Sequence, residues 1–392
     1  MSMLAQPSKG ICSPVNNLSL LPAQRELDPW ESMFRRNQYG YNVLTSIEVT
    51  VSQVCNLRCQ HCAVGDILHD KDPQPQVDLD LLLKRLDEIA TLDSLSITGG
   101  EPMYSKQMIR DYIVPLLRYA KGRGAKTQIN SNLTLDLDRY EPILPYLDVM
   151  HISYNYRDAH DFHRIAYARH RRDIPFKQAE KTFLKLVDNT RTLAKGGVFV
   201  SAESLLTPFT KDIIGQIHRS IKELGCKRHE VHPLYPSDFA RDMPLLSLEE
   251  LREAYHRLLD ERDPELWILF GTLPFYACSN KEEDLALIQR IYRTPNTTVR
   301  NDPDGHNRLN CNLFTGEVTV TDFGDVGPLG YVAQDSFQTC FERWQHHPAY
   351  QKLNCSCPQS QCNGPNLLVA HTYYPDLDFR SRKGIPITEI KG

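Results

Sequence analysis

Short apolar segments alternate with amphipathic segments over residues 44–233, and this alternation limits the fold more than any other feature. We expect strands at 44–54, 95–98, 127–130, 149–153, 198–203 and 229–233. Between them we expect helices at 79–90, 105–121, 138–145, 177–194 and 209–224. Such alternation predicts parallel strands joined by right-handed crossovers. Six strand–helix units in roughly 190 residues predict an α/β fold, a partial (β/α)6 TIM-like barrel.

The pattern changes after residue 236. A hairpin is expected from 309–314 and 317–321, followed by a helix around 336–353. We therefore predict a barrel core at 29–236 and a smaller C-terminal α+β unit at 237–392. Residues 1–28 carry polar residues without a period and are expected to be a flexible extension.

Composition narrows the class of protein. The chain has 392 residues, 41% hydrophobic and 24% charged, which is typical of a soluble enzyme. A formal charge of −4 argues against a general nucleic-acid surface. No stretch approaches the ~20 apolar residues of a membrane span, and no signal peptide is recognised. We expect a cytoplasmic protein whose eleven cysteines act as metal ligands more than as disulfides.

Three cysteines follow the first expected strand in the spacing C-x3-C-x2-C. Cys55, Cys59 and Cys62 form this loop. Iron–sulfur cubanes are normally held by four thiolates, so three leave one iron with an open position for chemistry. Zinc is the structural alternative, with His61 as the fourth ligand. His61 directly precedes Cys62, however, which disfavours both residues in one tetrahedron.

A glycine turn follows the second expected strand, at Gly99, Gly100, Glu101 and Pro102. Loops at the carboxyl ends of parallel strands meet on one face of a barrel, so this turn should neighbour the cysteine loop. Paired glycines allow close approach of a ligand to the backbone, whose N–H and C=O groups could hold the charged ends of an amino acid.

These two motifs together resemble the radical S-adenosylmethionine (SAM) superfamily over residues 44–236. The resemblance implies a [4Fe–4S] cluster on Cys55, Cys59 and Cys62, with SAM chelated at the open iron. It also implies reductive cleavage of SAM to a 5′-deoxyadenosyl radical, which abstracts a substrate hydrogen. A reductant such as flavodoxin or ferredoxin would supply the electron.

The resemblance extends to later strands. It implies SAM contacts at Ser131 and Asn132 after the third strand, and at Ser153 and Asn155 after the fourth. Residues of this type also cap turns without any ligand. The family often has Thr-Asn-Gly where this chain has Ser131-Asn132-Leu133. The fifth and sixth strands are expected to direct Ser201, Glu203 and His232 toward the same mouth.

A second cysteine group, Cys355, Cys357 and Cys362, has the spacing C-x-C-x4-C. With the preceding hairpin it resembles the SPASM/twitch extensions, and the whole chain resembles the YfkAB-type radical SAM proteins with a CxCxxxxC motif. This implies an auxiliary Fe–S cluster, with Cys311 as its fourth ligand and Cys340 as the substitute. A zinc knuckle remains the alternative.

The sequence leaves the substrate open. Peptide or protein modification is the leading hypothesis, by analogy with twitch-type extensions, and a small-molecule metabolite is the second. A different class is an Fe–S or zinc sensor or scaffold without turnover. The arginine-rich segment 156–175 is interpreted either as a lid over an anionic substrate or leader peptide, or as a solvated insertion.

Overall fold

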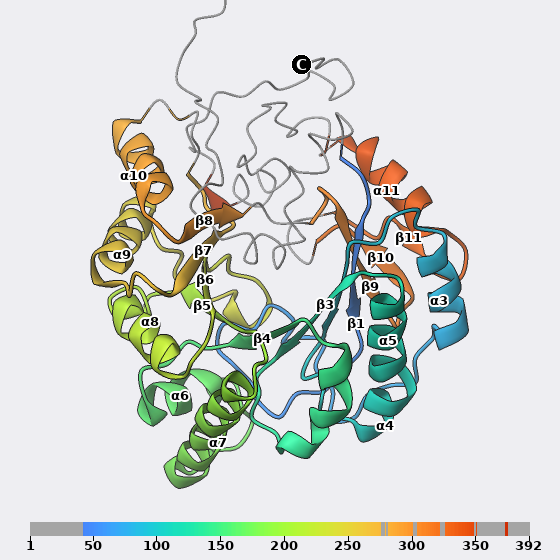
Figure 1. The fold of residues 1–392 in the computed structure, drawn as a ribbon, viewed down its shortest axis with the longest axis horizontal. Helices are drawn as coiled ribbons and strands as arrows, with labels where there is room; N and C mark the ends of the chain where they lie inside the picture. The colour runs from blue at the N-terminus through green and yellow to red at the C-terminus, as the bar shows by residue number, and fades with distance from the viewer. Residues whose placement is uncertain are drawn as a thin grey trace, which may run out of the picture.

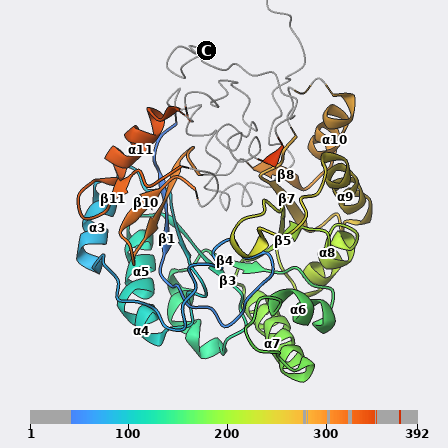
Figure 2. The ribbon, with the colours of Figure 1, turned by 180° about the vertical axis from the view of Figure 1, so that it is seen from behind.

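We analysed a computed structural model of the chain, which describes residues 42–275, 279, 281–300, 304–321, 326–348, 350 and 373–374. Helices surround a curved sheet on its outer side, as opposite views show (Figures 1 and 2). The expected extension at 1–28 and the ligands Cys355, Cys357 and Cys362 lie outside the described residues.

One eleven-stranded sheet runs through the described chain, in the order β11-β10-β9-β1-β2-β3-β4-β5-β6-β7-β8. The strands are β1 Ser46–Thr50, β2 Ser94–Thr98, β3 Lys126–Ser131, β4 Val149–Ser153, β5 Val200–Leu206, β6 Arg228–Pro233, β7 Trp267–Gly271, β8 Thr297–Arg300, β9 Arg308–Asn312, β10 Glu317–Thr319 and β11 Gly330–Tyr331. Parallel pairing connects β1 through β8, which confirms the α/β partial barrel.

The outer helices follow the strands in chain order. They are α3 Leu79–Asp87, α4 Lys106–Met108, α5 Val114–Gly122, α6 Ala159–Ala166, α7 Phe176–Lys195, α8 Ile214–Glu223, α9 Leu248–Glu261, α10 Glu282–Arg293 and α11 Phe337–Gln345. Asp78 caps α3 by accepting from the Leu81 N–H at 2.8 Å, and Leu82 and Leu86 bury the inner face of this helix.

Prolines explain two departures from the expected helices. The helix expected at 105–121 is split by a π-helical turn at Ile109–Ile113, because Pro115 has no N–H to continue the α-helical ladder. The helix expected at 138–145 is instead two 3₁₀ segments, Leu137–Arg139 and Glu141–Tyr146, the second carrying Pro145 inside it.

The segment after residue 236 joins the same sheet on both sides of the six expected strands. β7 pairs with β6, and β9 pairs with β1 through the register Glu48↔Asn310 and Val49↔Cys311. The expected hairpin is present, since β9 and β10 pair antiparallel. Leu309 and Phe341 also belong to the main hydrophobic core with the helices of the first half. The domain limits at 29–236 and 237–392 stay a prediction.

Among the described residues, no helix combines the length and the apolar character needed to cross a bilayer.

Candidate functional site

The cysteine loop follows the carboxyl end of β1 and is held by hydrogen bonds to backbone carbonyl groups of α6. The N–H of Arg58 donates to the Ala166 carbonyl at 3.0 Å, and the N–H of Gln60 donates to the Ile165 carbonyl at 2.9 Å. The Arg58 guanidinium also donates to the Cys55 carbonyl at 2.5 Å. These contacts hold the loop in one conformation before any ligand binds.

The three thiols of this loop are half-buried and close enough to affect one another electrostatically. Burial, and then the nearby Glu101, raises the pKa of Cys55 to about 12. Burial and the two neighbouring sulfurs raise the pKa of Cys59 well above its usual value. The Tyr156 hydroxyl forms a hydrogen bond with the Cys59 sulfur. The protein alone therefore disfavours thiolates here, and a bound cation is needed to stabilise them.

The donor set fits a wide iron–sulfur group better than a single ion. Among the described residues, no three Cys, His, Asp or Glu side chains converge closely enough to hold one metal ion. Structural zinc requires sulfurs that meet within about 2.3 Å of one metal. Three cysteine thiols on one loop are the ligand type that iron–sulfur clusters use.

The glycine turn packs directly against the strand that leads into the cysteine loop. The N–H of Gly100 donates to the Ser52 carbonyl and the N–H of Glu101 to the Val54 carbonyl, both at 2.7 Å. A Cβ on Gly100 would lie 2.4 Å from the Val54 carbonyl oxygen. These two N–H groups join the glycine turn to the segment that leads into the cysteine loop. The assignment of the turn to SAM stays a prediction.

Glu101 is fully buried and connects the glycine turn to the end of β3. Its carboxylate accepts from the Ser131 hydroxyl at 2.8 Å and from the N–H of Asn132 at 2.8 Å. Burial raises the pKa of Glu101 to about 7, against the opposing effect of its hydrogen-bond donors. The adjacent Pro102 is also buried. The sequence predicted Glu101 as a site residue. It did not indicate that the Glu101 carboxylate joins the glycine turn to the end of β3.

Asn132 lies beside the first cysteine. Its Nδ2 donates to Asn56 at 3.0 Å and approaches the Cys55 sulfur at 3.6 Å. Leu133 follows with a φ of 51°, in the left-handed region that favours glycine. The radical SAM family often has glycine at this position. Leu133 therefore adopts the left-handed backbone conformation that a glycine would adopt there.

The polar residues after β4 separate into two environments. Ser153 is exposed, whereas Asn155 is buried. Asn155 accepts from the N–H of Leu205 at 2.7 Å, and its Nδ2 lies 3.5 Å from Nε2 of His61. Burial lowers the pKa of His61 to about 4. Asn155 thus touches the cysteine loop, and its assignment to SAM stays a prediction.

Cys311, on β9, is buried with Cys340, on α11, in the main hydrophobic core. Burial, and then Cys340, raises the pKa of Cys311 to about 12. Cys311 pairs with Val49 in the register, on the strand that precedes the cysteine loop. Because Cys355, Cys357 and Cys362 lie outside the described residues, the second metal site stays a prediction.

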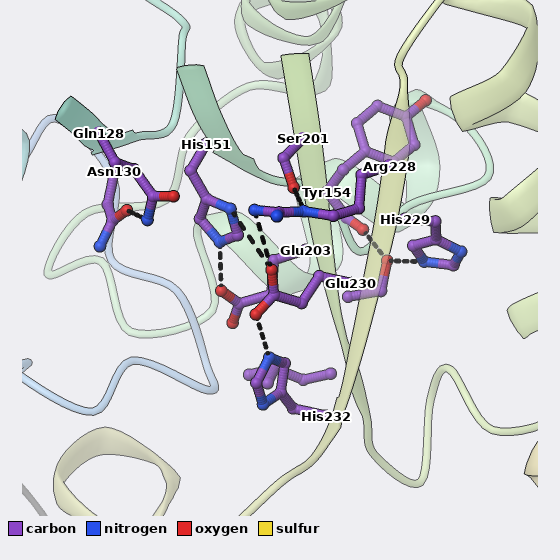
Figure 3. Close-up of polar contacts among 12 residues, drawn as sticks. Gln128, Asn130, His151, Tyr154, Ser201, Glu203, Arg228, His229, Glu230 and His232 are labelled. Carbon is purple, nitrogen blue, oxygen red and sulfur yellow. Dashed lines mark hydrogen bonds and ion pairs between the residues drawn. The ribbon is translucent and has the colours of Figure 1, made fainter. Parts of the chain in front are cut away.

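The strands direct a network of charged side chains to the inside of the sheet, most of which the sequence did not predict (Figure 3). Nε2 of His151 lies 2.7 Å from the Glu203 carboxylate, and Nε2 of His232 lies 3.0 Å from that of Glu230. Glu203 and His232 were expected at this mouth, but His151 and Glu230 were not. Their signal was polar residues at alternate positions of a strand, as at Glu230 and His232 of β6.

Comparisons with known proteins agree with this fold and site. Sequence models of two families match the chain, the radical SAM superfamily over residues 49–200 and the YfkB-like domain over residues 234–384. The structure of Streptococcus suis SuiB bound to S-adenosylmethionine superimposes with a TM-score of 0.58 at 13% identity, over 84% of this chain and 75% of SuiB. The structure of anSMEcpe with bound AdoMet gives a TM-score of 0.53 at 15% identity, over 76% of this chain and 80% of that one.

The fold and the family match define a radical SAM enzyme, which implies a [4Fe–4S] cluster and SAM as cofactors. Over 368 residues the chain is 52% identical to YfkA of Bacillus subtilis (strain 168), across 94% of this chain and 98% of that protein. The chain belongs to the YfkA family of radical SAM proteins.

Proposed function

We propose that the protein cleaves SAM reductively and abstracts hydrogen from a bound substrate, with Cys55, Cys59 and Cys62 as cluster ligands. When bound, the cluster supplies the electron that converts SAM to methionine and a 5′-deoxyadenosyl radical. The observation that carries the proposal is the arrangement of three thiols on one loop that is hydrogen-bonded to the glycine turn.

The chain's own residues position the reactants. Gly99, Gly100 and Pro102 shape the turn beside the cysteine loop, and Glu101 fixes Ser131 and Asn132 next to Cys55. Asn155 reaches the same loop through His61, and Ser153 lies at the exposed end of β4. The polar cavity of about 180 Å³ inside the sheet offers a surface for the substrate.

The test is anaerobic reconstitution, followed by addition of reductant and SAM. We expect 5′-deoxyadenosine from the native protein and none from Cys59→Ala. The matched control is Cys226→Ala, because Cys226 is also buried but lies outside the cysteine loop. A cluster that forms without 5′-deoxyadenosine would indicate the sensor or scaffold alternative.

An auxiliary Fe–S cluster on Cys311, Cys355, Cys357 and Cys362 is the second part of the proposal. The placement of β9 beside β1 supports it, since this pairing brings Cys311 to the strand that precedes the first cysteine loop. In a variant with Cys55, Cys59 and Cys62 all changed to Ala, iron and an electron paramagnetic resonance signal should survive. Zinc without iron in that variant would contradict the auxiliary cluster.

The electron donor is proposed to approach at a cavity of about 920 Å³ that Cys55 lines. Four arginines contribute to this cavity, Arg58, Arg169, Arg171 and Arg172, together with the acidic Asp66 and Asp70. The excess of guanidinium groups is complementary to an acidic protein such as flavodoxin or ferredoxin. This interpretation favours a docking role for the arginine-rich segment over the substrate lid.

Two substrate classes remain under the proposal. SuiB, which shares the fold, is described in complex with its precursor peptide SuiA, and this supports a peptide. The polar cavity of about 180 Å³ inside the sheet supports a small molecule.

A further inference from the structure

A cavity of about 180 Å³ lies inside the curve of the sheet, and its lining is almost entirely polar. Barrel interiors are usually filled by branched apolar side chains. Here the same layer is formed by residues from β1, β3, β4, β5, β6 and β9 and from the ends of β7 and β8: Glu48, Gln128, Asn130, His151, Glu203, Glu230, His232, Gly271, Thr272, Arg300 and Arg308. Burying ions costs several kcal/mol each, so this layer needs an explanation beyond packing.

Glu230 is surrounded by cationic partners within the protein. Its carboxylate pairs with Arg300, with Arg228 at 3.4 Å and with His232 at 3.0 Å. Its side chain is only 3% exposed. Glu230 therefore organises the cations of the cavity, while its buried Oε2 accepts no hydrogen bond from the described residues.

Glu203, the neighbour of Glu230 in the register, differs from it. Oε2 of Glu203 accepts from His151, while no described residue donates to Oε1. The Glu203 side chain is 32% exposed and lines the cavity. Figure 3 shows the contact between this carboxylate and His151, next to the carboxylate of Glu230.

Two further acceptor atoms face the same space. Gln128 donates to Asn130 through Nε2 at 2.9 Å, but its buried Oε1 has no hydrogen-bond partner among the described residues. Glu48 accepts from Asn130 and Arg308 through Oε2, both at 3.4 Å, and no described donor reaches its Oε1. Buried polar atoms are normally satisfied, and the Gln128 oxygen is buried without a partner among the described residues. Together with the carboxylate oxygens of Glu203 and Glu48 that line the same cavity, it defines a place for hydrogen-bond donors.

The unfilled acceptors favour a cationic donor. The carboxylates of this network are paired with Arg228, Arg300, Arg308 and His232, and the atoms left over are oxygens, two of them on the carboxylates of Glu203 and Glu48. An ammonium group supplies three N–H donors and one positive charge. It would satisfy acceptors that the protein leaves unfilled.

We propose that this cavity binds the primary ammonium group of the substrate, with Glu203 as its principal carboxylate and Gln128 and Glu48 as further acceptors. The identification of the ligand as a substrate rests on the proposed radical SAM function. The ammonium can belong to a free amine metabolite or to a lysine side chain of a peptide, and the two sources are separated by experiment.

The test is ligand-detected saturation-transfer NMR on the reconstituted holoenzyme without reductant. Saturating SAM is present, so that its own amino group does not compete. The probes are 1-aminopropane, the uncharged 1-propanol, Nα-acetyl-lysine amide, and a lysine-containing pentapeptide. The variants are Glu203→Gln, Glu203→Asp and the control Glu180→Gln, which lies exposed on α7.

We expect the amine to bind and the alcohol not to bind. Glu203→Gln should weaken amine binding by about tenfold or more, because a charge-assisted hydrogen bond is replaced by a neutral one. Glu203→Asp should retain part of the affinity, and Glu180→Gln all of it. Native-like thermal unfolding of Glu203→Gln would show that the fold is kept.

Tighter binding of the pentapeptide than of the free amine assigns the ammonium to a lysine side chain, and the reverse assigns it to a small molecule. Equal signals from amine and alcohol, or an amine signal indifferent to Glu203→Gln, would overturn the proposal. The measurement needs no turnover, so absence of 5′-deoxyadenosine would contradict the proposed function and leave this result intact.

Discussion

The carboxylate of Glu101 accepts a hydrogen bond of 2.8 Å from the backbone N–H of Asn132. Through this contact the turn after β2 is joined to the turn after β3, and Asn132 is placed beside the sulfur of Cys55. The stability of the site thus depends on a residue that need not touch a cofactor.

Glu101→Ala should lower the free energy of unfolding by about 3 kcal/mol, because it leaves buried donors of Ser131, Asn132 and Met103 without an acceptor. Glu101→Gln keeps one acceptor oxygen and should cost about 1 kcal/mol. Urea denaturation measures both, with exposed Glu180→Ala as the control. Equal losses for Ala and Gln would contradict the bridging role.

Gly100→Ala should destabilise the protein by about 1–3 kcal/mol and lower its iron content, since the new Cβ would displace the Val54 carbonyl next to Cys55. Gly122→Ala is the matched control, because nothing lies within 4 Å of its added Cβ, at the end of α5. That change should stabilise the helix by about 0.5–1 kcal/mol. Full iron content in Gly100→Ala would argue against the tight contact.

Charge reversal at Arg171 and Arg172 should slow electron delivery by flavodoxin by about tenfold or more, since complementary charge chiefly sets association rates. Reduction by a small neutral photoreductant should be unaffected. The control reverses Lys181 and Lys195, exposed residues of α7 that lie outside this cavity. A loss that is equal with both reductants would indicate damage to the cluster instead of lost docking.

The buried pair His218 and His229 should make the fold acid-sensitive. Their Nδ1 atoms lie 3.0 Å apart, and burial lowers the pKa of His218 from 6.5 to about 4 and that of His229 well below its usual value. The unfolded chain takes up protons first as the pH falls below 6.5, so stability decreases toward pH 4.

The free energy of unfolding should fall by about 1.4 kcal/mol per pH unit for each histidine as the pH decreases. Urea midpoints between pH 5 and 6.5 measure it, a range taken from the shift of His218. His218→Asn should flatten the curve, whereas His346→Gln, on the exposed end of α11, should not. An unchanged slope in His218→Asn would refute the assignment.

Periodicity was enough to predict the parallel strands, because a buried parallel strand is a short apolar run whatever its neighbours are. It located β1 through β6 and the β9–β10 hairpin. It could not reveal that β9 pairs with β1, since long-range register depends on tertiary packing. The local spacing of Cys55, Cys59 and Cys62 indicated the family directly.

The interior network was only partly accessible to sequence reasoning. Glu203 and His232 were noticed because they lie near strand ends, whereas His151 is a single polar residue within an apolar run and Glu230 lies in the middle of a largely polar strand. Their role arises only when the three neighbouring strands β4, β5 and β6 are assembled in register. Likewise, no local pattern indicates that the N–H groups of Gly100 and Glu101 donate to the carbonyl groups of Ser52 and Val54.

The pairing of β9 with β1 means that the two halves of this protein cannot be exchanged as independent modules. Arg308 and Glu48 are ion-paired although they are 260 positions apart. A chain severed between its two family-matched regions would leave β1 with a bare edge immediately upstream of the cysteine loop. Gene fission, or recombination with a foreign C-terminal half, would thus disturb the cysteine loop that follows β1.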